Sequence, residues 1–309
     1  MTYTPLDEVA ARLGPLARRH VPLGPLTTYR VGGAAAVAVL VESDDDLAAL
    51  AAAVATVDVE ILVVGKGSNL LVADGGFAGV AVQLGEAFAT IEIDGIRVRA
   101  GGAASLPVVA RRTAAAGLTG FEWAVGVPGS IGGAVRMNAG GHGSDMAATV
   151  TRVRVVDLSG DEDGEMPAEA LAFGYRRSNI GPHQLVRWAE LALTTGERAV
   201  AEAEISEIVR WRRVHQPGGQ NAGSVFTNPP GDSAGRLVEA AGAKGLRMGT
   251  AEVSPKHSNF IPADDVGAAD DVRALMVEVR RRVLDATGVE LAVETCLVGF
   301  ERPLRSGVP

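Results

Sequence analysis

The chain has 309 residues and a formal net charge of −8, and this acidic balance argues against general nucleic-acid binding, which needs a basic surface. Its 47% hydrophobic and 21% charged residues are typical of a soluble globular protein long enough for more than one domain. Cys296 is the only cysteine, so an intrachain disulfide and a cysteine-based metal cluster are both excluded.

The N-terminal residues and the apolar runs bear on where the protein acts. Residues 1–10 carry Asp7 and Glu8 and lack the basic and then apolar order of a signal peptide. The apolar runs near residues 31–41 and 47–57 are shorter than the roughly 20 residues that span a membrane. We therefore expect a cytoplasmic monomer with no membrane partner and no nucleic-acid partner.

The first predicted elements are a strand, a helix and a second strand. Residues 36–41 form a β-like run, and Ser43 is the expected N-cap of a helix with aspartates in its first turn. Residues 61–64 predict a buried strand that ends in a turn over residues 65–69. The consecutive main-chain N–H groups of such a turn can bind an anion. The turn lacks the glycine spacing of a Rossmann fingerprint or a P-loop, so neither of those sites is predicted.

The next elements lead to a glycine-rich centre. Residues 79–84 predict a short strand, and residues 91–100 alternate apolar and polar side chains as one longer strand. Ser105 is the expected N-cap of a helix that Gly117 ends.

Residues 117–143 form the stretch around which the rest of the chain is organised. Its glycines stand at positions 117, 120, 126, 129, 132, 133, 140, 141 and 143. Because each glycine in a helix costs about 1 kcal/mol relative to alanine, no long helix is expected here. Phe121, Trp123 and Ile131 are too apolar for a surface loop. We predict a cradle whose main chain approaches a large, flat, partly anionic ligand.

The C-terminal half begins with strands and continues with helices. Residues 150–158 and 185–193 predict strands, and the acidic residues 161–165 between them predict a solvated loop tip. Amphipathic helices are predicted over residues 200–214 and 270–287. We also expect a helix capped by Ser233 and a last strand, residues 289–300, that carries Glu294.

Few residues in this chain are obvious candidates for chemistry. The five histidines are scattered, without the spacing of a zinc site or a catalytic triad, so no metal site is predicted. Arg176, Ser224 and Glu294 stand out as polar residues in apolar or glycine-rich settings. Spacing alone favours a plainer explanation for each, as a surface ion-pair partner, a turn residue and a solvent-facing residue on an edge strand.

Six ordered motifs change that balance, because together they resemble the UDP-N-acetylenolpyruvoylglucosamine reductase family, also called UDP-N-acetylmuramate dehydrogenases. The motifs are Thr28–Gly33, Gly65–Asn69, Gly126–Gly140, Gly174–Ser178, Ala222–Pro229 and Val253–Phe260. They follow the family's order from about residue 26 to residue 300. The short chain resembles the shorter of the family's two structural types.

The resemblance implies an α+β fold class. It combines a two-part FAD-binding region of the vanillyl-alcohol-oxidase-like (PCMH) type with a C-terminal α+β substrate-binding domain. On this basis we expect a first FAD-binding subdomain over residues 1–85, joined by the C-terminal segment 290–309. The second FAD-binding subdomain is expected over residues 86–199, and the domain that binds the UDP-sugar over residues 200–289.

The resemblance also implies a reaction in the synthesis of the peptidoglycan precursor of the cell wall. NADPH reduces non-covalently bound FAD, and the flavin then passes hydride to the enol ether of UDP-N-acetylglucosamine enolpyruvate, which gives UDP-N-acetylmuramate. By position, Ser224 would be the general acid, and Arg176 and Glu294 would flank the substrate carboxylate. Arg176 fits this role physically, because a cation placed there gains interaction energy as negative charge develops.

The remaining site residues are also carried over by position. The cofactor-binding residues would be Gly65, Lys66, Gly67, Ser68, Asn69, Gly126, Pro128, Gly129, Ser130, Gly132, Gly133 and Ala134. The substrate-binding residues would be Tyr175, Asn228, Lys256 and His257.

Two other functions stay open at this point. The first is an oxygen-using sugar or alcohol oxidase on the same flavin fold. No histidine lies between His20 and His142, so a covalent flavin tether in the turn 65–69 is excluded, but an untethered oxidase is not. The second is a non-catalytic flavin-binding paralogue, although all three proposed catalytic positions are filled.

Overall fold

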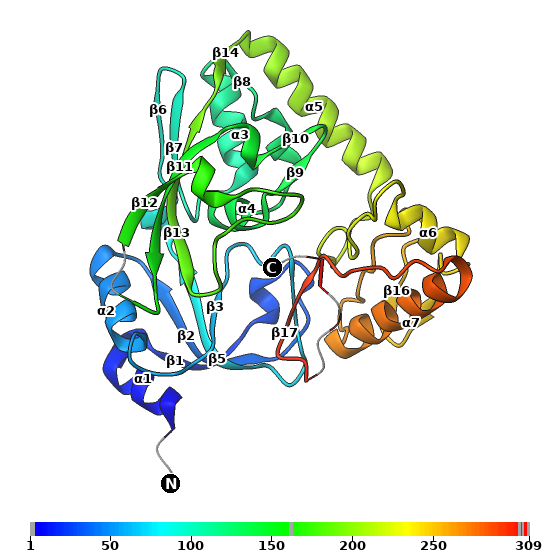
Figure 1. Ribbon diagram of the computed structural model, residues 1–309, viewed down its shortest axis with the longest axis horizontal. Coiled ribbons are helices and arrows are strands. Elements are labelled where there is room, and N and C mark those ends of the chain that lie inside the picture. Colours follow the sequence, from blue (N-terminus) through cyan, green and yellow to red (C-terminus); the bar gives the residue numbers. More distant parts are fainter. Residues whose placement is uncertain (1–3, 161–162, 302–303, 305, 308–309) are drawn as a thin grey trace. The chain divides into compact units, whose positions relative to one another are not determined.

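The computed structural model describes residues 4–160, 163–301, 304, 306 and 307 (Figure 1). The chain divides into two compact units. The first unit comprises Met1–Val21, Ala36–Lys66 and Gly79–Arg212, and the second comprises Pro22–Ala35, Gly67–Ala78 and Arg213–Pro309. The chain therefore passes between the units several times, and short N-terminal segments belong to the unit that contains the C-terminal third. The three functional domains expected from the sequence stay a prediction.

The first unit contains a four-stranded sheet in the order β1-β2-β5-β3. Its strands are β1 (Arg18–Pro22), β2 (Ala34–Val41), β5 (Phe77–Leu84) and β3 (Ile61–Val63). Every second residue of β2 is buried, as expected for a strand with one face on a core. Helices α1 (Pro5–Leu13) and α2 (Asp44–Val54) pack against one another (Figure 1). The predicted cap of α2 is confirmed, because the Asp46 N–H donates to the Ser43 hydroxyl at 3.1 Å.

A second, antiparallel sheet of five strands completes the first unit in the order β12-β11-β13-β7-β6. Its strands are β12 (Asp163–Pro167), β11 (Val150–Asp157), β13 (Gln184–Ala192), β7 (Arg97–Gly101) and β6 (Ile91–Asp94). Helix α4 (Ile131–Met137) packs against β13 and β7, and α3 (Leu106–Ala115) packs against the 3₁₀ helix η4 (Glu122–Gly126) (Figure 1). The core under these helices includes Phe121, Ile131 and Val153, all fully buried.

The single strand predicted over residues 91–100 is wrong. The structure has a hairpin there, with β6 and β7 antiparallel and Asp94 opposite Arg97. The chain reverses at Gly95, whose φ of 58° favours glycine, and Ile96 is 49% exposed in the turn. The two strands share the same alternation of apolar and polar residues, so the pattern alone did not reveal the turn between them.

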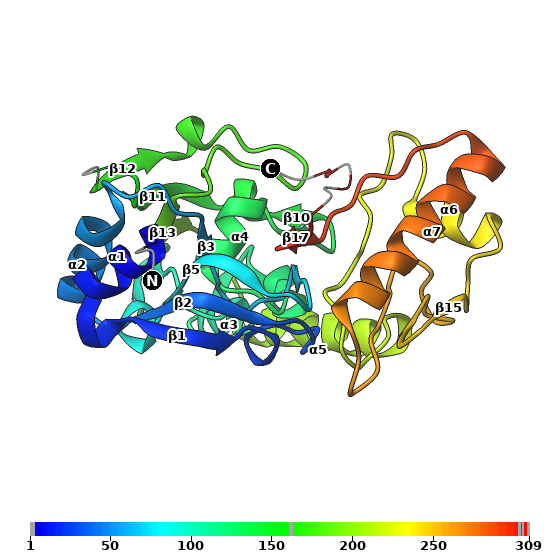
Figure 2. The same cartoon turned by 90° about the horizontal axis from the view of Figure 1, so that it is seen from below.

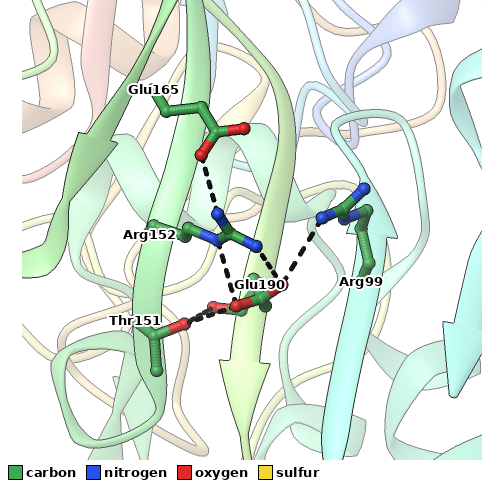
Figure 3. Close-up of polar contacts among 5 residues, drawn as sticks. All are labelled: Arg99, Thr151, Arg152, Glu165 and Glu190. Atoms are coloured by element: carbon green, nitrogen blue, oxygen red, sulfur yellow. Dashed lines mark hydrogen bonds and ion pairs between the residues drawn. The ribbon is translucent and has the colours of Figure 1, made fainter. Parts of the chain in front are cut away.

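The outer face of the five-stranded sheet carries a network of charged side chains (Figure 3). Glu190 on β13 accepts two hydrogen bonds from Arg152 on β11, at 3.1 and 3.0 Å, and lies 3.5 Å from Arg99 on β7. Arg152 also donates to Glu165 at 2.8 Å. This corrects the predicted solvated loop tip. Glu165 belongs to the paired strand β12, whereas residues 161–162 lie outside the described residues.

The glycine-rich stretch contains no long helix, as predicted, but it is more regular than a loop. It holds a 3₁₀ helix, η4 (Glu122–Gly126), the seven-residue α4, and the short hairpin strands β9 (Gly140–Gly141) and β10 (Ser144–Asp145). Ser130 caps α4, and Asn138 ends it in a left-handed conformation with φ 40°. The helix is short because both ends are fixed by capping residues.

The second unit is built around two helices, α6 (Ala234–Ala240) and α7 (Ala269–Thr287), which lie side by side in both views (Figures 1 and 2). Both predictions of a helix are confirmed. Ser233 accepts a hydrogen bond from the Arg236 N–H, and Gly288 ends α7 with φ 73°. Val272 and Met276 of α7 are fully buried in a core that also contains Leu237 of α6.

The last predicted strand is shorter than expected. Only β17 (Cys296–Val298) is a strand, and it pairs in parallel with β4 (Leu70–Val72) of the same unit. Before it, Val293 makes an isolated antiparallel bridge with Phe226. Residues 289–300 therefore contact two different partners in turn, which interrupts a continuous strand.

The remaining elements are short, apart from one long helix. They are η1 (Gly14–Leu16), η2 (Gly24–Leu26), η3 (Glu86–Phe88), β8 (Leu118–Thr119), η5 (Met146–Ala148), η6 (Ala168–Leu171), β14 (Thr194–Thr195), α5 (Arg198–His215), β15 (Arg247–Met248) and β16 (Ala251–Glu252). The boundary between the two units falls within α5, after Arg212.

Candidate functional site

A groove in the first unit brings two of the predicted cofactor-binding stretches together. It is lined by Gly65 and Lys66 from the turn after β3 and by Ser130, Gly132 and Gly133 at the start of α4. Its empty volume is about 610 Å³, part of it open solvent. The other lining residues are Val63, Val64, Gln83, Leu84, Gly102, Ala103, Arg136, Ile180, Gln184, Leu185 and Val186. None of these eleven was among the predicted site residues, because they come from strands, loops and α4, and nothing in the sequence distinguishes a groove wall from other packed positions.

At Gly65 the groove wall lies close to Ser130. A Cβ atom on Gly65 would stand 2.4 Å from the Ser130 hydroxyl oxygen, so no larger residue fits there without displacing the cap of α4. Within the part of the chain that the structure describes, the main-chain N–H groups of Gly65 and Lys66 have no hydrogen-bond partner. Two unpaired donors beside an exposed lysine fit an anionic group such as a dinucleotide phosphate.

The start of α4 offers fewer donors than the sequence suggested. The Ile131 N–H donates to the Ala104 carbonyl and the Gly132 N–H donates to the Gly102 carbonyl, both at 2.9 Å. The Gly133 N–H faces the Ser130 hydroxyl at 3.4 Å. These donors are already used inside the protein. Contacts between this stretch and a cofactor stay a prediction and would come from other atoms.

Four further predicted cofactor residues lie in different settings. A Cβ on Gly126 would meet the Arg212 side chain at 2.9 Å, so this glycine makes room for α5. The Gly129 carbonyl accepts from the Leu106 N–H at 3.0 Å, and Ala134 is 3% exposed in the core. Pro128 is exposed. Packing explains three of these residues, and their assignment to the cofactor stays a prediction.

The rest of the glycine turn belongs to the second unit. Gly67 has φ 58°, and a Cβ there would stand 2.2 Å from the Leu26 carbonyl oxygen, so this position requires glycine. The Gly67 carbonyl accepts from the Thr28 N–H at 3.2 Å. The Thr28–Gly33 motif and the turn are therefore one local structure. Ser68 and Asn69 follow as half-buried residues.

Arg176 lies at the tip of a tight turn in the first unit. Gly174 and Arg177 pair across the turn, and Arg176 has φ 58°, a conformation that costs a non-glycine residue about 1–3 kcal/mol. Its guanidinium donates to the Gly140 carbonyl at 3.2 Å and lies 5.1 Å from the centre of the Tyr175 ring. Tyr175 is 56% exposed. A strained arginine beside an exposed tyrosine is typical of a binding site rather than of a packing position.

An asparagine that the sequence analysis missed holds this turn. Asn138, 3% exposed at the end of α4, donates from its amide to the Gly174 carbonyl at 3.0 Å. Its amide oxygen accepts from the Ala147 N–H at 3.0 Å. Asn138 lies within one of the quoted motifs, but its left-handed backbone conformation could not be read from the sequence.

Ser224 and Glu294 come together in the second unit, although 70 positions separate them in the chain. The Glu294 N–H donates to the carbonyl of Val225, the residue after Ser224, at 2.7 Å. Both side chains are half-buried. The amide of Asn69 in turn donates to the Glu294 carbonyl at 3.0 Å. Three of the sequence motifs and segments thus meet around Glu294, whereas Arg176 belongs to the other unit.

The three remaining substrate-binding candidates make local contacts in the second unit. Asn228 accepts from the Ala234 N–H at 3.0 Å, and Lys256 donates to the Arg213 carbonyl at 2.7 Å. His257 packs edge-on against Phe260, with ring centres 4.7 Å apart. Burial lowers the pKa of His257, so the ring is neutral near pH 7. Each contact leaves polar atoms of the side chain for a ligand, and the substrate roles stay predictions.

Neither a metal centre nor a membrane-spanning helix is found in the described part of the chain. No group of three or more His, Cys, Asp or Glu side chains there is arranged to hold a metal ion. No helix among the described residues combines the length and the apolar character needed to cross a membrane.

Comparison with known proteins assigns both parts of the chain. Residues 35–162 match the family model of an FAD binding domain. Residues 214–298 match the model of the UDP-N-acetylenolpyruvoylglucosamine reductase C-terminal domain. The predicted fold class, a PCMH-type FAD-binding region followed by a C-terminal α+β domain, is therefore confirmed, and FAD is the cofactor of the N-terminal part.

Relatives extend the match over nearly the whole chain. The UDP-N-acetylenolpyruvoylglucosamine reductase of Acidiphilium cryptum is 42% identical over 296 residues, which cover 96% of this chain and 94% of the relative. That of Paramagnetospirillum magneticum is 42% identical, with 91% of each chain covered. The crystal structure of the reductase from Thermus caldophilus superposes with a TM-score of 0.80 at 35% identity, covering 91% of this chain and 99% of that one. The chain therefore belongs to the UDP-N-acetylenolpyruvoylglucosamine reductase family.

Proposed function

We propose that the chain is an FAD-dependent oxidoreductase that reduces UDP-N-acetylglucosamine enolpyruvate to UDP-N-acetylmuramate in peptidoglycan precursor synthesis. Membership of the reductase family supports the substrate and the reaction type. The observation that carries the proposal is the main-chain hydrogen bond from the Glu294 N–H to the Val225 carbonyl, because it brings the segment of Glu294 beside the loop of Ser224 from a distant part of the chain. NADPH is the proposed reductant.

The proposed chemistry begins with charge development on the substrate. Bound FAD would supply hydride to the methylene carbon of the enol ether. The electron pair of the double bond would then lie on the carbon next to the carboxylate, and negative charge would be shared with that carboxylate. Arg176 would provide the cation that stabilises this charge, and its hydrogen bond to the Gly140 carbonyl would hold the guanidinium in place before the charge appears.

Ser224 completes the proposed reaction by protonating that carbon. A hydroxyl is a weak acid in water, but a carbanion is a strong base, so positioning rather than acidity limits the transfer. Ser224 is half-buried, which leaves part of its side chain accessible to a ligand while its loop is fixed by main-chain hydrogen bonds. Glu294 flanks the substrate carboxylate beside this donor.

The cofactor is proposed to lie in the groove of the first unit. Its residues Gly65, Lys66 and Ser130 would contact the dinucleotide, with the unpaired N–H groups of Gly65 and Lys66 bound to phosphate oxygens. Gly67 and Ser68 continue the same turn and are proposed to add main-chain donors. Tyr175, Asn228, Lys256 and His257 are proposed to bind the UDP-sugar.

A comparison of half-reactions tests the chemical roles. The purified protein should be yellow, release FAD on denaturation and oxidise NADPH only when the enolpyruvyl UDP-sugar is present. Ser224→Ala should keep flavin reduction by NADPH and lose most of the substrate-dependent flavin reoxidation. Ser233→Ala is a suitable control, because it removes a hydroxyl from the cap of α6 in the same unit. A Ser224→Ala protein with both half-reactions at wild-type rates would contradict the assignment of the proton donor.

Measurement of oxygen consumption distinguishes the proposed reductase from an oxidase. The proposed reductase should consume little oxygen during turnover, whereas an untethered oxidase should reduce oxygen with no UDP-sugar present. A non-catalytic paralogue would bind FAD and show neither activity. We further propose that the enzyme acts in the cytoplasm. We also propose that it is a monomer, and gel filtration of the flavin-loaded protein tests this oligomeric state.

A further inference from the structure

Asn259 makes an unusual pair of contacts with the loop that carries Ser224. The Phe226 N–H donates to the amide oxygen of Asn259 at 3.0 Å, and the amide nitrogen of Asn259 donates to the Phe226 carbonyl at 2.8 Å. One side chain thus satisfies both main-chain groups of one residue, as a neighbouring strand would. Asn259 is 3% exposed and Phe226 is 1% exposed, so water cannot replace either bond without opening the structure.

The main chain of Asn259 reinforces this arrangement. Its carbonyl accepts from the Val225 N–H at 2.9 Å. On the opposite side of the loop, the Val225 carbonyl accepts from the Glu294 N–H, and Phe226 pairs with Val293. The two residues after Ser224 are therefore held between Asn259 on one side and the segment of Val293 and Glu294 on the other.

Asn259 is itself held in place by a tight turn. The ring nitrogen Nδ1 of His257 accepts from the Asn259 N–H at 3.3 Å, and the His257 carbonyl accepts from the Phe260 N–H at 3.0 Å. Ser254 closes the turn from the other end by donating from its N–H to the Phe260 carbonyl at 2.9 Å. Because this turn fixes the Asn259 side chain, which bonds to Phe226, it also fixes the position of the Ser224 loop.

We propose that Asn259 is a positioning residue that sets where the Ser224 hydroxyl stands relative to Glu294. The inference rests on the proposed function, in which Ser224 delivers a proton to substrate carbon. Proton delivery depends steeply on geometry, and a misplacement of about 1 Å can slow a step by roughly 100-fold. Only an amide side chain supplies one donor and one acceptor in this plane. An aspartate would place a carboxylate oxygen against the Phe226 carbonyl, and a leucine would leave both Phe226 groups unpaired.

Two variants of Asn259 and a matched control test the proposal in the full-length, FAD-loaded protein. Asn259→Leu removes both bonds at similar volume, and Asn259→Asp keeps the acceptor while removing the donor. Thr250→Val is the control, because the Thr250 hydroxyl accepts from the Ala268 N–H and donates to Asp271, both at 2.8 Å in the same unit, and so bonds to residues outside the Ser224 loop. All proteins are compared at equal folded fraction, so loss of stability alone does not change the rates.

The first readout is independent of activity. Amide hydrogen exchange at Phe226 should become at least about tenfold faster in both Asn259 variants and should not change in Thr250→Val. The second readout separates the half-reactions. Flavin reduction by NADPH should stay within about twofold of wild type, whereas reoxidation by the enolpyruvyl UDP-sugar should slow by roughly 10- to 100-fold with a larger solvent deuterium isotope effect.

A double variant decides whether Asn259 acts through Ser224. If it does, Asn259→Leu should slow reoxidation little further once Ser224 is alanine. Independent effects that multiply in the double variant would overturn the proposal, and so would wild-type reoxidation in a protein whose Phe226 amide exchanges faster. If Asn259→Leu does not fold, Asn259→Asp supplies the same comparison. A wild-type protein whose reduced flavin is never reoxidised by the UDP-sugar would instead overturn the proposed function. The exchange data would still report on the hydrogen bonds between Asn259 and Phe226.

Discussion

The side-chain amide of Asn69 donates a hydrogen bond to the main-chain carbonyl of Glu294, with 3.0 Å between nitrogen and oxygen. The Asn69 carbonyl accepts from the Cys296 N–H at 2.9 Å, so the asparagine is bonded to the chain on both sides of Thr295. Asn69 ends the glycine turn proposed to contact the cofactor. This residue therefore links the cofactor turn to the segment that carries a proposed catalytic carboxylate.

Replacing Asn69 should affect the reaction with substrate more than the binding of the cofactor. Asn69→Ala removes one partly buried hydrogen bond, a loss of about 0.5–1.5 kcal/mol of stability, and frees the segment around Glu294 to shift. We expect slower flavin reoxidation by the UDP-sugar, with a smaller change in FAD affinity. Stopped-flow spectroscopy and FAD titration measure the two effects. A large loss of FAD affinity with normal reoxidation would show that the amide binds flavin directly.

Gly65→Ala should weaken FAD binding. The added Cβ would lie 2.4 Å from the Ser130 oxygen, so the serine must leave its capping position, which costs about 0.5–2 kcal/mol, and the groove narrows. We expect roughly tenfold weaker FAD affinity, because 1.4 kcal/mol corresponds to a factor of ten. Gly164→Ala is the matched control, since a Cβ there has no neighbour within 4 Å. Equal affinities in the two variants would remove Gly65 from the cofactor site.

The half-buried side chain of His257 predicts that the stability of the protein depends on pH. Burial lowers the pKa of His257, so the folded protein keeps the ring neutral at a pH where the unfolded chain, with an ordinary value near 6.5, is already protonated. The unfolded state then binds more protons than the folded state. The stability that the neutral ring contributes is therefore complete above about pH 6.5 and is lost as pH falls below it. Urea unfolding at several pH values should show a shallower decline for His257→Gln. An equal decline in the wild type and in His257→Gln would contradict this prediction.

Glu190 should matter more than Glu165 for the stability of the first unit. The Glu190 side chain is 13% exposed and that of Glu165 is 42% exposed, so solvent weakens the outer pair more. Hydrogen bonds from Arg152 lower the pKa of Glu190, so its stabilising effect is present above the usual carboxyl range and is lost as pH falls through it. Glu190→Gln should lower the urea midpoint at neutral pH, with a smaller shift for Glu165→Gln. Equal shifts would contradict this order.

The sequence predicted those parts of the fold that depend on local patterns. Ser43, Ser233 and Gly288 mark helix ends by their own chemistry, so these boundaries agree with the structure. The single strand over residues 91–100 was wrong, because the alternation continues across a local turn at Gly95. The continuous last strand was wrong, because its pairing depends on distant segments. Periodicity within a segment carries no information about such partners.

The candidate site shows the same division. The family resemblance pointed to Ser224 and Glu294, but the hydrogen bond that brings their segments together joins the main chains of Val225 and Glu294, which any sequence could form. Asn138 and Asn259 lie within quoted motifs and were not selected, because a buried amide that pairs with a distant main-chain segment looks in sequence like any polar turn residue. The use of the α4 N–H groups inside the protein was equally hidden.

An anaerobic experiment tests whether the enolpyruvyl UDP-sugar reoxidises the reduced flavin, the step on which the proposed function depends. The FAD-loaded protein is reduced with one equivalent of NADPH in the absence of oxygen and then mixed with UDP-N-acetylglucosamine enolpyruvate. The proposed function predicts rapid return of the oxidised flavin spectrum with formation of UDP-N-acetylmuramate, and Ser224→Ala should block this step. Flavin that stays reduced with the UDP-sugar and is reoxidised only when oxygen is admitted would contradict the account.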